Sequence, residues 1–253
     1  MRRFKIENIK NGIGFLRGKE ARHAIKVLRL SVGDEVIVFD GSGNEYLAKI
    51  EALSTSGLRL KILEKLEIDR ESPLKTRLYL GLTNKLSSFE LALQKATELG
   101  VNEIVPVICK RSSFGDKIKN WEGKLQRWRY ILTNAAKQCG RNVIPEIYEP
   151  IFLKDVNPEM ELNFVMWEVG GQSLKKYQEY YPKSVSILIG PEGGLEKEEV
   201  DSLIEKGFKV TTLGKRILKV ETAAIVSLAL VQFMWGDIGE DNVAKSLNEG
   251  AEK

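Results

Sequence analysis

The stretch that decides the fold covers residues 184–236 and reads SVSILIGPEGGLEKEEVDSLIEKGFKVTTLGKRILKVETAAIVSLALVQFMWG. It opens with an apolar run, 185–189, which predicts a strand buried on both faces, and it breaks at the glycine-rich turn 190–194. An acidic amphipathic helix and a second strand follow. This second strand, 208–213, runs into another glycine-bearing turn and then into an almost wholly apolar helix. Two strands therefore end in glycine-bearing turns that lead into helices.

Turns of this kind mark ligand sites in parallel sheets. In an open α/β sheet, ligands bind outside the carboxyl ends of the strands. Glycine lets main-chain atoms approach a ligand closely, and a helix N-terminus leaves N–H donors unpaired. Either turn alone is better explained by a tight turn before a helix than by a ligand site. The two together favour a ligand site made of main-chain atoms.

The rest of the chain predicts two domains. Short strands at 35–40, 45–52 and 58–66, with one helix at 19–30, indicate a small β-barrel. After the polar segment 69–73, strands alternate with helices, as in a parallel α/β sheet. Ser87 and Glu90 predict a capping box at the first of these helices. We expect a β-barrel domain over 1–70, an α/β domain over 74–240 and a polar tail over 241–253.

Composition narrows the class of protein. The chain has 253 residues, 39 Lys+Arg and a net charge of +4, which fits an anionic partner without requiring one. Two cysteines cannot form a disulfide framework, so we expect a reducing compartment. No signal-peptide or membrane-spanning pattern occurs, which predicts a soluble cytoplasmic protein. One histidine and two isolated cysteines give no metal-ligand cluster.

Two motifs resemble those of a known family. LIGPEGG at 188–194 and LGKRILKVETA at 213–223 are similar to the C-terminal hallmark of the RsmE family, which methylates N3 of a uridine in 16S ribosomal RNA of the small subunit. HAIKVLRLSVGDEVIVFDGSGNEY, at 23–46, resembles the family's N-terminal PUA-like RNA-binding domain. The resemblance implies a SPOUT-type α/β domain with a trefoil knot, which binds S-adenosylmethionine at a homodimer interface. Lys219 and Val220 depart from the family's usual Arg and Thr.

The resemblance also implies which residues hold the cofactor. Both glycine-bearing turns, and a third turn after a strand at 162–168, belong to that pocket. Acidic residues at 196–199 would repel a pyrophosphate but suit a sulfonium, and they equally stabilise a helix start. The expected cofactor-binding residues are Trp167, Glu168, Ile189, Gly190, Pro191, Glu192, Gly193, Gly194, Leu213, Gly214, Ile217, Leu218, Thr222 and Ala223.

Methylation at uridine N3 defines the catalytic expectation. The proton on N3 must leave, so the site needs a base or cations that stabilise an anionic uracil. We expect Arg111, Arg141 and Arg216 to stabilise that charge, and Glu221 to orient a loop or accept the proton. The expected RNA-binding residues, mostly basic, are Arg2, Arg3, Arg17, Arg22, His23, Lys26, Arg29, Lys85 and Gln138.

Two alternatives stay open at this point. A SPOUT enzyme acting on ribose or on another base would share the fold, although the LGKRILKVETA wording argues against it. A non-catalytic RNA-binding or ribosome-assembly protein would share both the fold and the basic residues. Binding of S-adenosylmethionine separates this second alternative from an enzyme.

Overall fold

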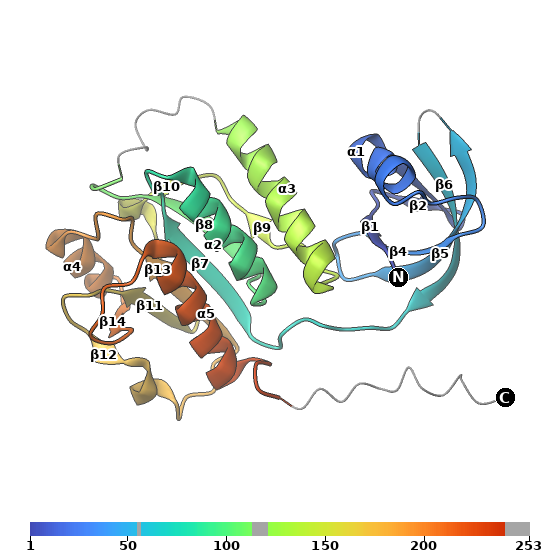
Figure 1. Cartoon of the computed structure of the whole chain (residues 1–253). Coiled ribbons are helices and arrows are strands. Elements are labelled where there is room, and N and C mark those ends of the chain that lie inside the picture. Colours follow the sequence, from blue (N-terminus) through green and yellow to red (C-terminus); the bar gives the residue numbers. More distant parts are fainter. Residues whose placement is uncertain (55–56, 113–120, 241–253) are drawn as a thin grey trace.

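The chain folds around two sheets, as a computed structural model that describes residues 1–54, 57–112 and 121–240 shows. The N-terminal sheet and the larger C-terminal sheet lie in separate halves of the molecule, joined by an extended connection (Figure 1). Helix α3 (Glu122–Cys139) stands between the larger sheet and the N-terminal half. This arrangement places a domain junction along one side of α3.

The N-terminal sheet has six strands in the order β1-β4-β5-β6-β3-β2. Strand β1 pairs with β4 in parallel and the remaining ladders are antiparallel. Inward side chains such as Phe4, Leu16 and Leu58 form its core. The strands are β1 (Arg3–Lys5), β2 (Ile9–Lys10), β3 (Ile13–Arg17), β4 (Glu35–Phe39), β5 (Glu45–Ser54) and β6 (Gly57–Leu66).

The helix predicted at 19–30 covers residues 18–27 in the structure and is only partly α-helical. It consists of α1 (Gly18–Arg22) and a π-helical turn, η1 (His23–Val27). The Leu28 N–H donates to the His23 carbonyl at 3.1 Å, which is the wider π-type spacing. Arg29 then has a φ of 55°, in the left-handed region, so the helix cannot continue to residue 30.

The C-terminal sheet has eight strands, and each ladder among the described residues is parallel. Its order is β10-β8-β7-β13-β11-β14-β12, with β9 also paired to β8. The strands are β7 (Lys75–Gly81), β8 (Glu103–Ile108), β9 (Glu146–Ile147), β10 (Ile151–Phe152), β11 (Leu162–Met166), β12 (Gln172–Ser173), β13 (Ser184–Ile189) and β14 (Lys209–Thr212).

Helices cover both faces of this sheet. One face packs against α2 (Leu86–Glu98), α3 and α5 (Val220–Trp235), and the other against α4 (Lys197–Glu205). Successive strand residues alternate between the two cores, so that Leu78 and Leu80 lie in one and Tyr79 in the other. Short 3-10 helices occur at η3 (Leu153–Asp155) and η4 (Leu174–Tyr177).

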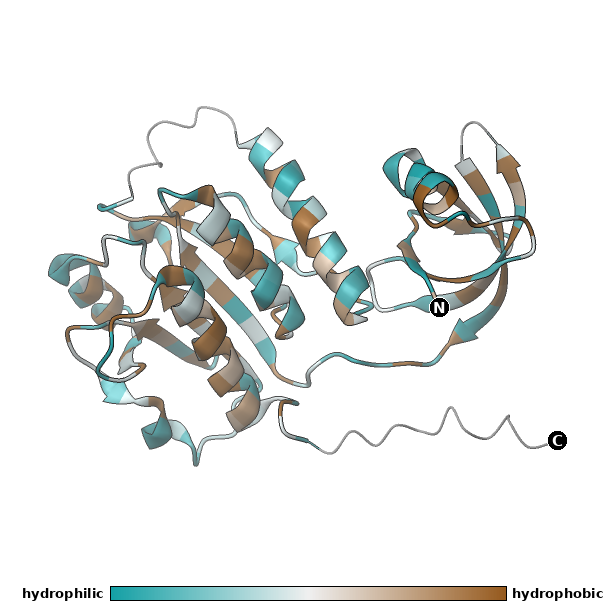
Figure 2. Ribbon diagram, in the orientation of Figure 1, coloured by the Kyte–Doolittle hydropathy of each residue, from teal (hydrophilic) through white to brown (hydrophobic). Residues whose placement is uncertain are grey.

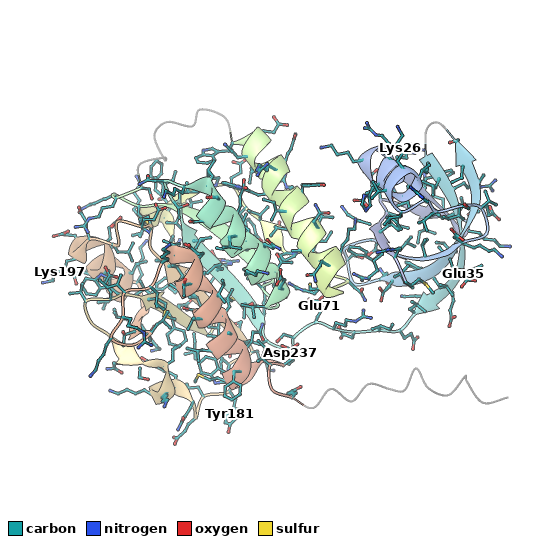
Figure 3. All side chains as sticks on the ribbon, in the orientation of Figure 1. Lys26, Glu35, Glu71, Tyr181, Lys197 and Asp237 are labelled. Carbon is teal, nitrogen blue, oxygen red and sulfur yellow. The ribbon has the colours of Figure 1, made fainter. Side chains whose placement is uncertain are left out.

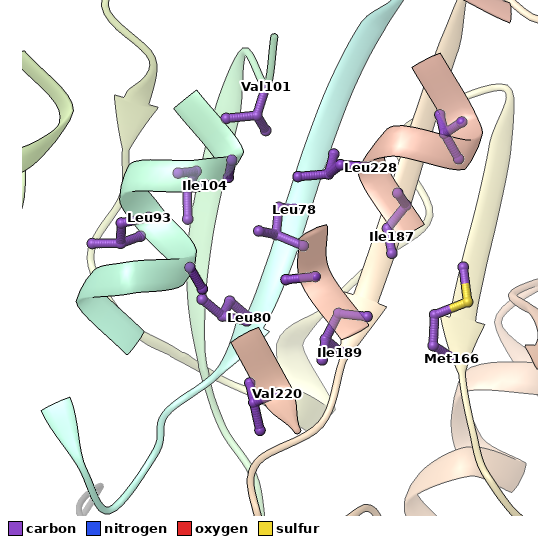
Figure 4. Close-up of a cluster of buried hydrophobic side chains, with 14 of the residues drawn as sticks. Leu78, Leu80, Leu93, Val101, Ile104, Met166, Ile187, Ile189, Val220 and Leu228 are labelled. Atoms are coloured by element: carbon purple, nitrogen blue, oxygen red, sulfur yellow. The ribbon is translucent and has the colours of Figure 1, made fainter. Parts of the chain in front are cut away.

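The two cores explain the apolar strand sequences. Figure 4 shows Leu78, Leu80, Ile187 and Ile189 on adjacent strands, in the cluster that also holds Leu228 of α5. The helices carry apolar stripes toward the sheet and polar residues outward (Figure 2). Strands buried on both faces read as continuous apolar runs, so the prediction of a buried strand at 185–189 is confirmed, with a small shift in its bounds.

Helix starts were predicted less well. The predicted capping box at Ser87 and Glu90 is wrong, because α2 begins at Leu86 with Lys85 as its N-cap residue and no side-chain cap. The Glu90 carboxylate instead accepts a hydrogen bond from Nη2 of Arg127 on α3, at 2.6 Å. A capping box does occur at α4, where the Glu199 side chain accepts the Glu196 N–H at 2.9 Å.

The chain crosses the sheet before its last helix. Strand β14 pairs with β11, but α5 packs on β13, β7 and α2. The segment 213–219 therefore returns over the carboxyl ends of the central strands. The predicted architecture, a parallel α/β sheet that follows a small N-terminal β domain, is confirmed.

Charged contacts hold the two halves together. The Lys137 ammonium on α3 donates to both carboxylate oxygens of Glu20 at 2.9 and 2.7 Å. Arg3 of β1 donates to Glu45 at 2.7 Å and to the side-chain oxygen of Asn142 at 2.5 Å. Glu71 lies at the same junction, near the C-terminal end of α3 (Figure 3). Side-chain ion pairs and hydrogen bonds thus join the two halves at this junction, together with main-chain hydrogen bonds between Gly41 and Ile144 and between Gly43 and Asn142.

Candidate functional site

Three turns meet at the carboxyl edge of the larger sheet. In the ladders around β11, Met166 is opposite Ile189 of β13 and Thr211 of β14. The chain leaves all three strands at this edge, because parallel strands share their direction. The turns that begin at Trp167, Gly190 and Leu213 therefore lie side by side, and the predicted proximity of the two glycine-bearing turns is confirmed.

A hollow opens between the first and third of these turns, and we call it the cradle. It holds about 70 Å³, well below the ~300 Å³ of a typical ligand pocket, so this protomer alone does not enclose a ligand of nucleoside size. Apolar side chains and main-chain atoms of the turns make up most of its wall. The lining residues are Met166, Trp167, Glu168, Thr212, Leu213, Gly214, Arg216, Ile217, Leu218 and Ala223.

The 190–194 turn borders the cradle without lining it. Gly194 has a φ of +71°, and a Cβ there would lie 2.8 Å from Oε1 of Glu168. At the end of β7, a Cβ on Gly81 would lie 2.5 Å from the Pro191 nitrogen. At Gly81 only glycine fits, because the close atoms belong to the backbone, whereas at Gly194 the positive φ favours glycine. Ile189, Gly190, Pro191 and Gly193 thus shape the wall behind the cradle, and Thr222 is exposed beside it.

The Glu192 carboxylate binds main-chain groups of the protein itself. It accepts hydrogen bonds from the main-chain N–H groups of Asn84 and Lys85, at 2.6 and 3.4 Å. An acidic side chain here also complements the N-terminal dipole of α2. Glu192 therefore ties the turn to α2 and positions it. Lys85, expected on the substrate face, lies at this carboxyl edge.

Arg111 also lies on the 190–194 turn. Its Nη1 donates to the Gly193 carbonyl at 2.9 Å, and its Nε is 3.7 Å from Glu196. The neighbouring Lys110 ammonium donates to Glu196 at 2.9 Å, and this hydrogen bond lowers the pKa of Glu196 and raises that of Lys110. Arg111 is half exposed, so the turn carries a fixed positive group near the cradle.

Arg216 and Glu221 are available for chemistry. Arg216 is exposed at the rim of the cradle, and Glu221 is partly buried in the first turn of α5. No hydrogen bond or ion pair involves either side chain within the described residues. They differ in this from Arg111 and Arg141.

Arg141 was expected to stabilise charge at the reacting base, and its position corrects this expectation. It is 4% exposed, and its Nη1 donates to the carbonyls of Thr97 and Val101 at 2.9 and 2.8 Å. Its Nε and Nη2 donate to the Glu71 carboxylate. A guanidinium that is buried and bound to these groups inside the protein cannot reach an RNA base.

The expected RNA-binding residues separate into groups. Arg2, Arg3, His23 and Gln138 line one hollow of about 530 Å³ at the domain junction, while Arg17 lies in a different one. Arg22, Lys26 and Arg29 are exposed around α1, where Figure 3 shows Lys26 on the outer face. Arg3 is again a correction, because its guanidinium is bound by Glu45, Asn142 and main-chain carbonyls.

The sequence interpretation missed Met166 and Thr212. Met166 closes the floor of the cradle, and the Thr212 hydroxyl accepts the Gly214 N–H at 3.3 Å, which shapes the third turn. A threonine two residues before a glycine is a known turn signal, but the strand predicted at 208–213 includes Thr212. Met166 gave no signal beyond that of a buried strand residue.

The described residues contain neither a candidate metal site nor a helix that could span a membrane. Histidine, cysteine and acidic side chains form no group of three or more that could hold a metal ion. None of the described helices is long and apolar enough to cross a membrane.

Known protein families account for both halves of the chain. The RNA methyltransferase domain family matches residues 70–232, and the RNA methyltransferase PUA domain family matches residues 16–63. The fold and the cradle thus define an RNA methyltransferase of the SPOUT class.

Individual relatives agree over nearly the whole length. Ribosomal RNA small subunit methyltransferase E of Mesomycoplasma hyopneumoniae is 36% identical over 90% of this chain and 97% of its own, and that of Bacillus subtilis is 30% identical over 92% and 96%. The chain belongs to the ribosomal RNA small subunit methyltransferase E family. Among solved structures, the Neisseria gonorrhoeae member bound to S-adenosyl methionine matches with a TM-score of 0.85 and 32% identity, covering 94% of this chain and 99% of that one. A putative methyltransferase from Legionella pneumophila, also with the bound cofactor, matches with a TM-score of 0.86 and 31% identity, covering 93% and 98%.

Proposed function

We propose that this chain methylates N3 of a uridine in 16S ribosomal RNA of the small subunit, with S-adenosylmethionine as methyl donor. The cradle carries the proposal, since it gathers main-chain and apolar atoms at the carboxyl edge of three adjacent strands. The relatives' names and the two cofactor-bound neighbours support it. On this proposal residues 1–70 bind RNA, residues 74–240 carry out methyl transfer, and the protein works in the cytoplasm.

The cradle suits a neutral heteroaromatic ring better than a phosphate. Its wall combines Met166, Leu213, Leu218 and Ala223 with main-chain groups of tight turns. Glu168 adds a carboxylate at the edge, which complements the positive sulfonium and ammonium groups of the cofactor. Bound there, S-adenosylmethionine supplies an electrophilic methyl group.

The charged residues at the rim have separate roles. Arg216 and Arg111 stabilise the negative charge that develops on the uracil ring as the N3 proton leaves. Arg216 is exposed at the rim, whereas Arg111 is held against Gly193. Glu221 lies in the first turn of α5, where its carboxylate accepts the proton or orients the loop before it.

A homodimer would close the open side of the cradle. Ile217 at the cradle is 84% exposed, and α5 presents Leu230 and Phe233 to the outside, with Phe233 67% exposed. Large apolar side chains exposed together on one helix usually mark an interface. We therefore propose that a second copy covers α5 and the 213–218 turn.

The test has a binding part and an activity part. Calorimetry should show saturable binding of S-adenosylmethionine, which Gly214→Trp abolishes while circular dichroism and thermal unfolding stay close to those of the parent. Small subunits from cells lacking the gene should gain one N3-methyluridine on incubation with protein and cofactor. Mass spectrometry of the digested RNA locates it.

Other outcomes would decide for the alternatives. A methyl group on a ribose or on another base would overturn the N3 assignment while leaving a SPOUT enzyme. RNA binding without cofactor binding would favour a non-catalytic assembly protein. Unchanged cofactor binding in Gly214→Trp would show that the cradle is not the cofactor site.

A further inference from the structure

We propose that a groove between the two domains binds an unpaired segment of RNA by stacking bases on Phe15 and Tyr130. This groove is separate from the cradle and lies along α3, on the side facing the N-terminal sheet. The inference rests on the proposed function, because it takes RNA as the partner. It adds a recognition site for RNA that lies away from the methylated base.

The groove is built by both domains. It has a volume of about 510 Å³, with β1 to β3 and α1 on one side and α3 on the other. Phe15 of β3 is 47% exposed and Tyr130 of α3 is 54% exposed, although both are large aromatic side chains. An exposed aromatic ring beside a hollow provides a surface on which a base can stack. The six residues that carry the inference are Lys5, Lys10, Phe15, Arg17, Lys19 and Tyr130.

A cation lies over each aromatic ring, so a base that stacks on that face takes the place of the cation. The Arg17 guanidinium is 5.4 Å from the centre of the Phe15 ring, and the Lys19 ammonium is 5.5 Å from the centre of the Tyr130 ring. A nucleotide needs the same pair of groups, an aromatic face for the base and a cation for the adjoining phosphate. The two pairs therefore fit two positions along one strand.

Charge in the groove favours an anion. Lys5, Lys10, Arg17 and Lys19 face two acidic residues, Glu7 and Glu20. The Glu20 carboxylate is already bound through both oxygens by Lys137 of α3. Its negative charge is thus compensated, and the groove keeps an excess of positive charge over Glu7.

The contact that compensates Glu20 also fixes the groove. Glu20 belongs to α1 and Lys137 to α3, so their ion pair joins the two walls. Arg3 joins them a second time through Glu45 and Asn142. A preformed groove binds its ligand without the cost of ordering its walls.

Size and chemistry select an unpaired strand. A hollow of this volume accepts groups of nucleotide size, whereas bases in a duplex are stacked on each other and hidden from the aromatic rings. An acidic peptide would bind to the four cations, but its binding would not require the aromatic rings of Phe15 and Tyr130. Effects of the two aromatic residues therefore distinguish the ligands.

The experiment measures fluorescence anisotropy of the full chain with three labelled probes: a mixed-sequence single-stranded RNA of 12 nucleotides, a blunt RNA duplex of equal length, and a polyglutamate peptide. The matched control is the double variant Tyr181→Ala with Lys176→Ala, an exposed aromatic and an exposed cation away from the groove. Calorimetry with S-adenosylmethionine accompanies each variant as a check of the fold.

We expect Phe15→Ala and Tyr130→Ala each to weaken single-strand binding by ~10-fold, and the two together by up to ~100-fold, without changing its salt dependence. The double variant Lys10→Ala with Arg17→Ala should reduce the magnitude of the slope of log affinity against log salt concentration by about 1.4. This is the change expected when two phosphate contacts to a single strand are lost. Cofactor binding should be unchanged in all variants.

Three results would overturn the groove assignment. They are single-strand binding that survives loss of both aromatic residues, an equal loss in the control, and tighter binding of the duplex or the peptide than of the single strand. Because cofactor binding and methylation of small subunits are measured separately, the groove can fail while the proposed function stands. The reverse failure, RNA binding through the groove without any methylation, would be equally visible.

Discussion

The guanidinium of Arg141 lies against the carboxylate of Glu71, with Nε to Oε2 at 3.0 Å and Nη2 to Oε2 at 2.5 Å. Glu71 belongs to the segment that connects the two sheets, and Arg141 follows the C-terminal end of α3. The same guanidinium also donates to the carbonyls of Thr97, in the last turn of α2, and of Val101, which follows that helix. This pair therefore joins the connecting segment to two helix ends.

Removing Arg141 should mainly destabilise the protein. Arg141→Ala removes the guanidinium from the two carbonyls and leaves the Glu71 carboxylate with only the Val143 N–H at 3.4 Å, and breaking a buried ion pair in this way typically costs about 3–5 kcal/mol. Urea denaturation should show this loss, and the affinity for S-adenosylmethionine at 15 °C should stay within about twofold. A stable Arg141→Ala protein with strongly reduced methyl transfer would restore the catalytic assignment.

Gly81 should be essential for the shape of the 190–194 turn. In Gly81→Ala the new Cβ would meet the Pro191 nitrogen at 2.5 Å, so the turn must shift away from β7. We expect at least ~10-fold weaker cofactor binding by calorimetry, because the wall behind the cradle moves. Gly123→Ala is the matched control, since an added Cβ there has nothing within 4 Å and α3 should gain up to ~1 kcal/mol. Equal cofactor affinities in both variants would show that the turn is not part of the site.

Arg216 should act on the chemical step. Arg216→Ala is expected to lower the single-turnover rate of methyl transfer by ~100-fold, the usual effect of losing one donor to a developing anion. Cofactor affinity should change little, because Arg216 lies at the rim and not in the floor of the cradle. Lys215→Ala, its exposed neighbour, serves as the control. If the two variants have the same rate, another cation stabilises the uracil.

The buried thiol of Cys109 should make the free energy of unfolding fall as the pH becomes alkaline. Burial, and then the charge of Glu199, raises the pKa of the Cys109 thiol from 9.0 to about 12. The folded state keeps the thiol neutral while the unfolded state ionises, so stability is fully present below pH 9 and falls as the pH rises from about 9 to 12. The unfolding constant should increase by up to tenfold per pH unit in that window. Urea titrations at pH 8, 9.5 and 10.5 should show the excess slope in the parent, and Cys109→Ala should lack it.

Phe233 should control the oligomeric state. Phe233→Glu would place two unpaired carboxylates in the proposed interface of α5, and we expect it to convert a dimer to a monomer in sedimentation experiments. Phe152→Glu, another exposed aromatic residue outside α5, should leave the dimer intact. Cofactor binding should weaken with Phe233→Glu, since the open cradle loses its cover. A parent protein that sediments as a monomer at micromolar concentration would contradict the dimer.

The sequence predicted the elements of the sheet well because burial on both faces leaves a continuous apolar run. The 185–189 strand and the helix after Glu221 could be read from a short window. Helix starts failed where contacts from afar decided them. Glu90 is held by Arg127 of α3 and not by the cap of its own helix, and no local pattern contains that partner.

The same division runs through the site. The glycine-bearing turns and the family's motifs were local features, so the sequence by itself determined the class of fold and predicted which residues hold the cofactor. Only the tertiary structure decided which charged residues are available. The sequence does not distinguish three arginines that differ in the structure. Arg111 is fixed on a turn, Arg141 is buried at the domain junction and Arg216 is exposed at the rim. The physical reason is that the role of a charge depends on partners distant in the sequence, and only folding brings those partners together.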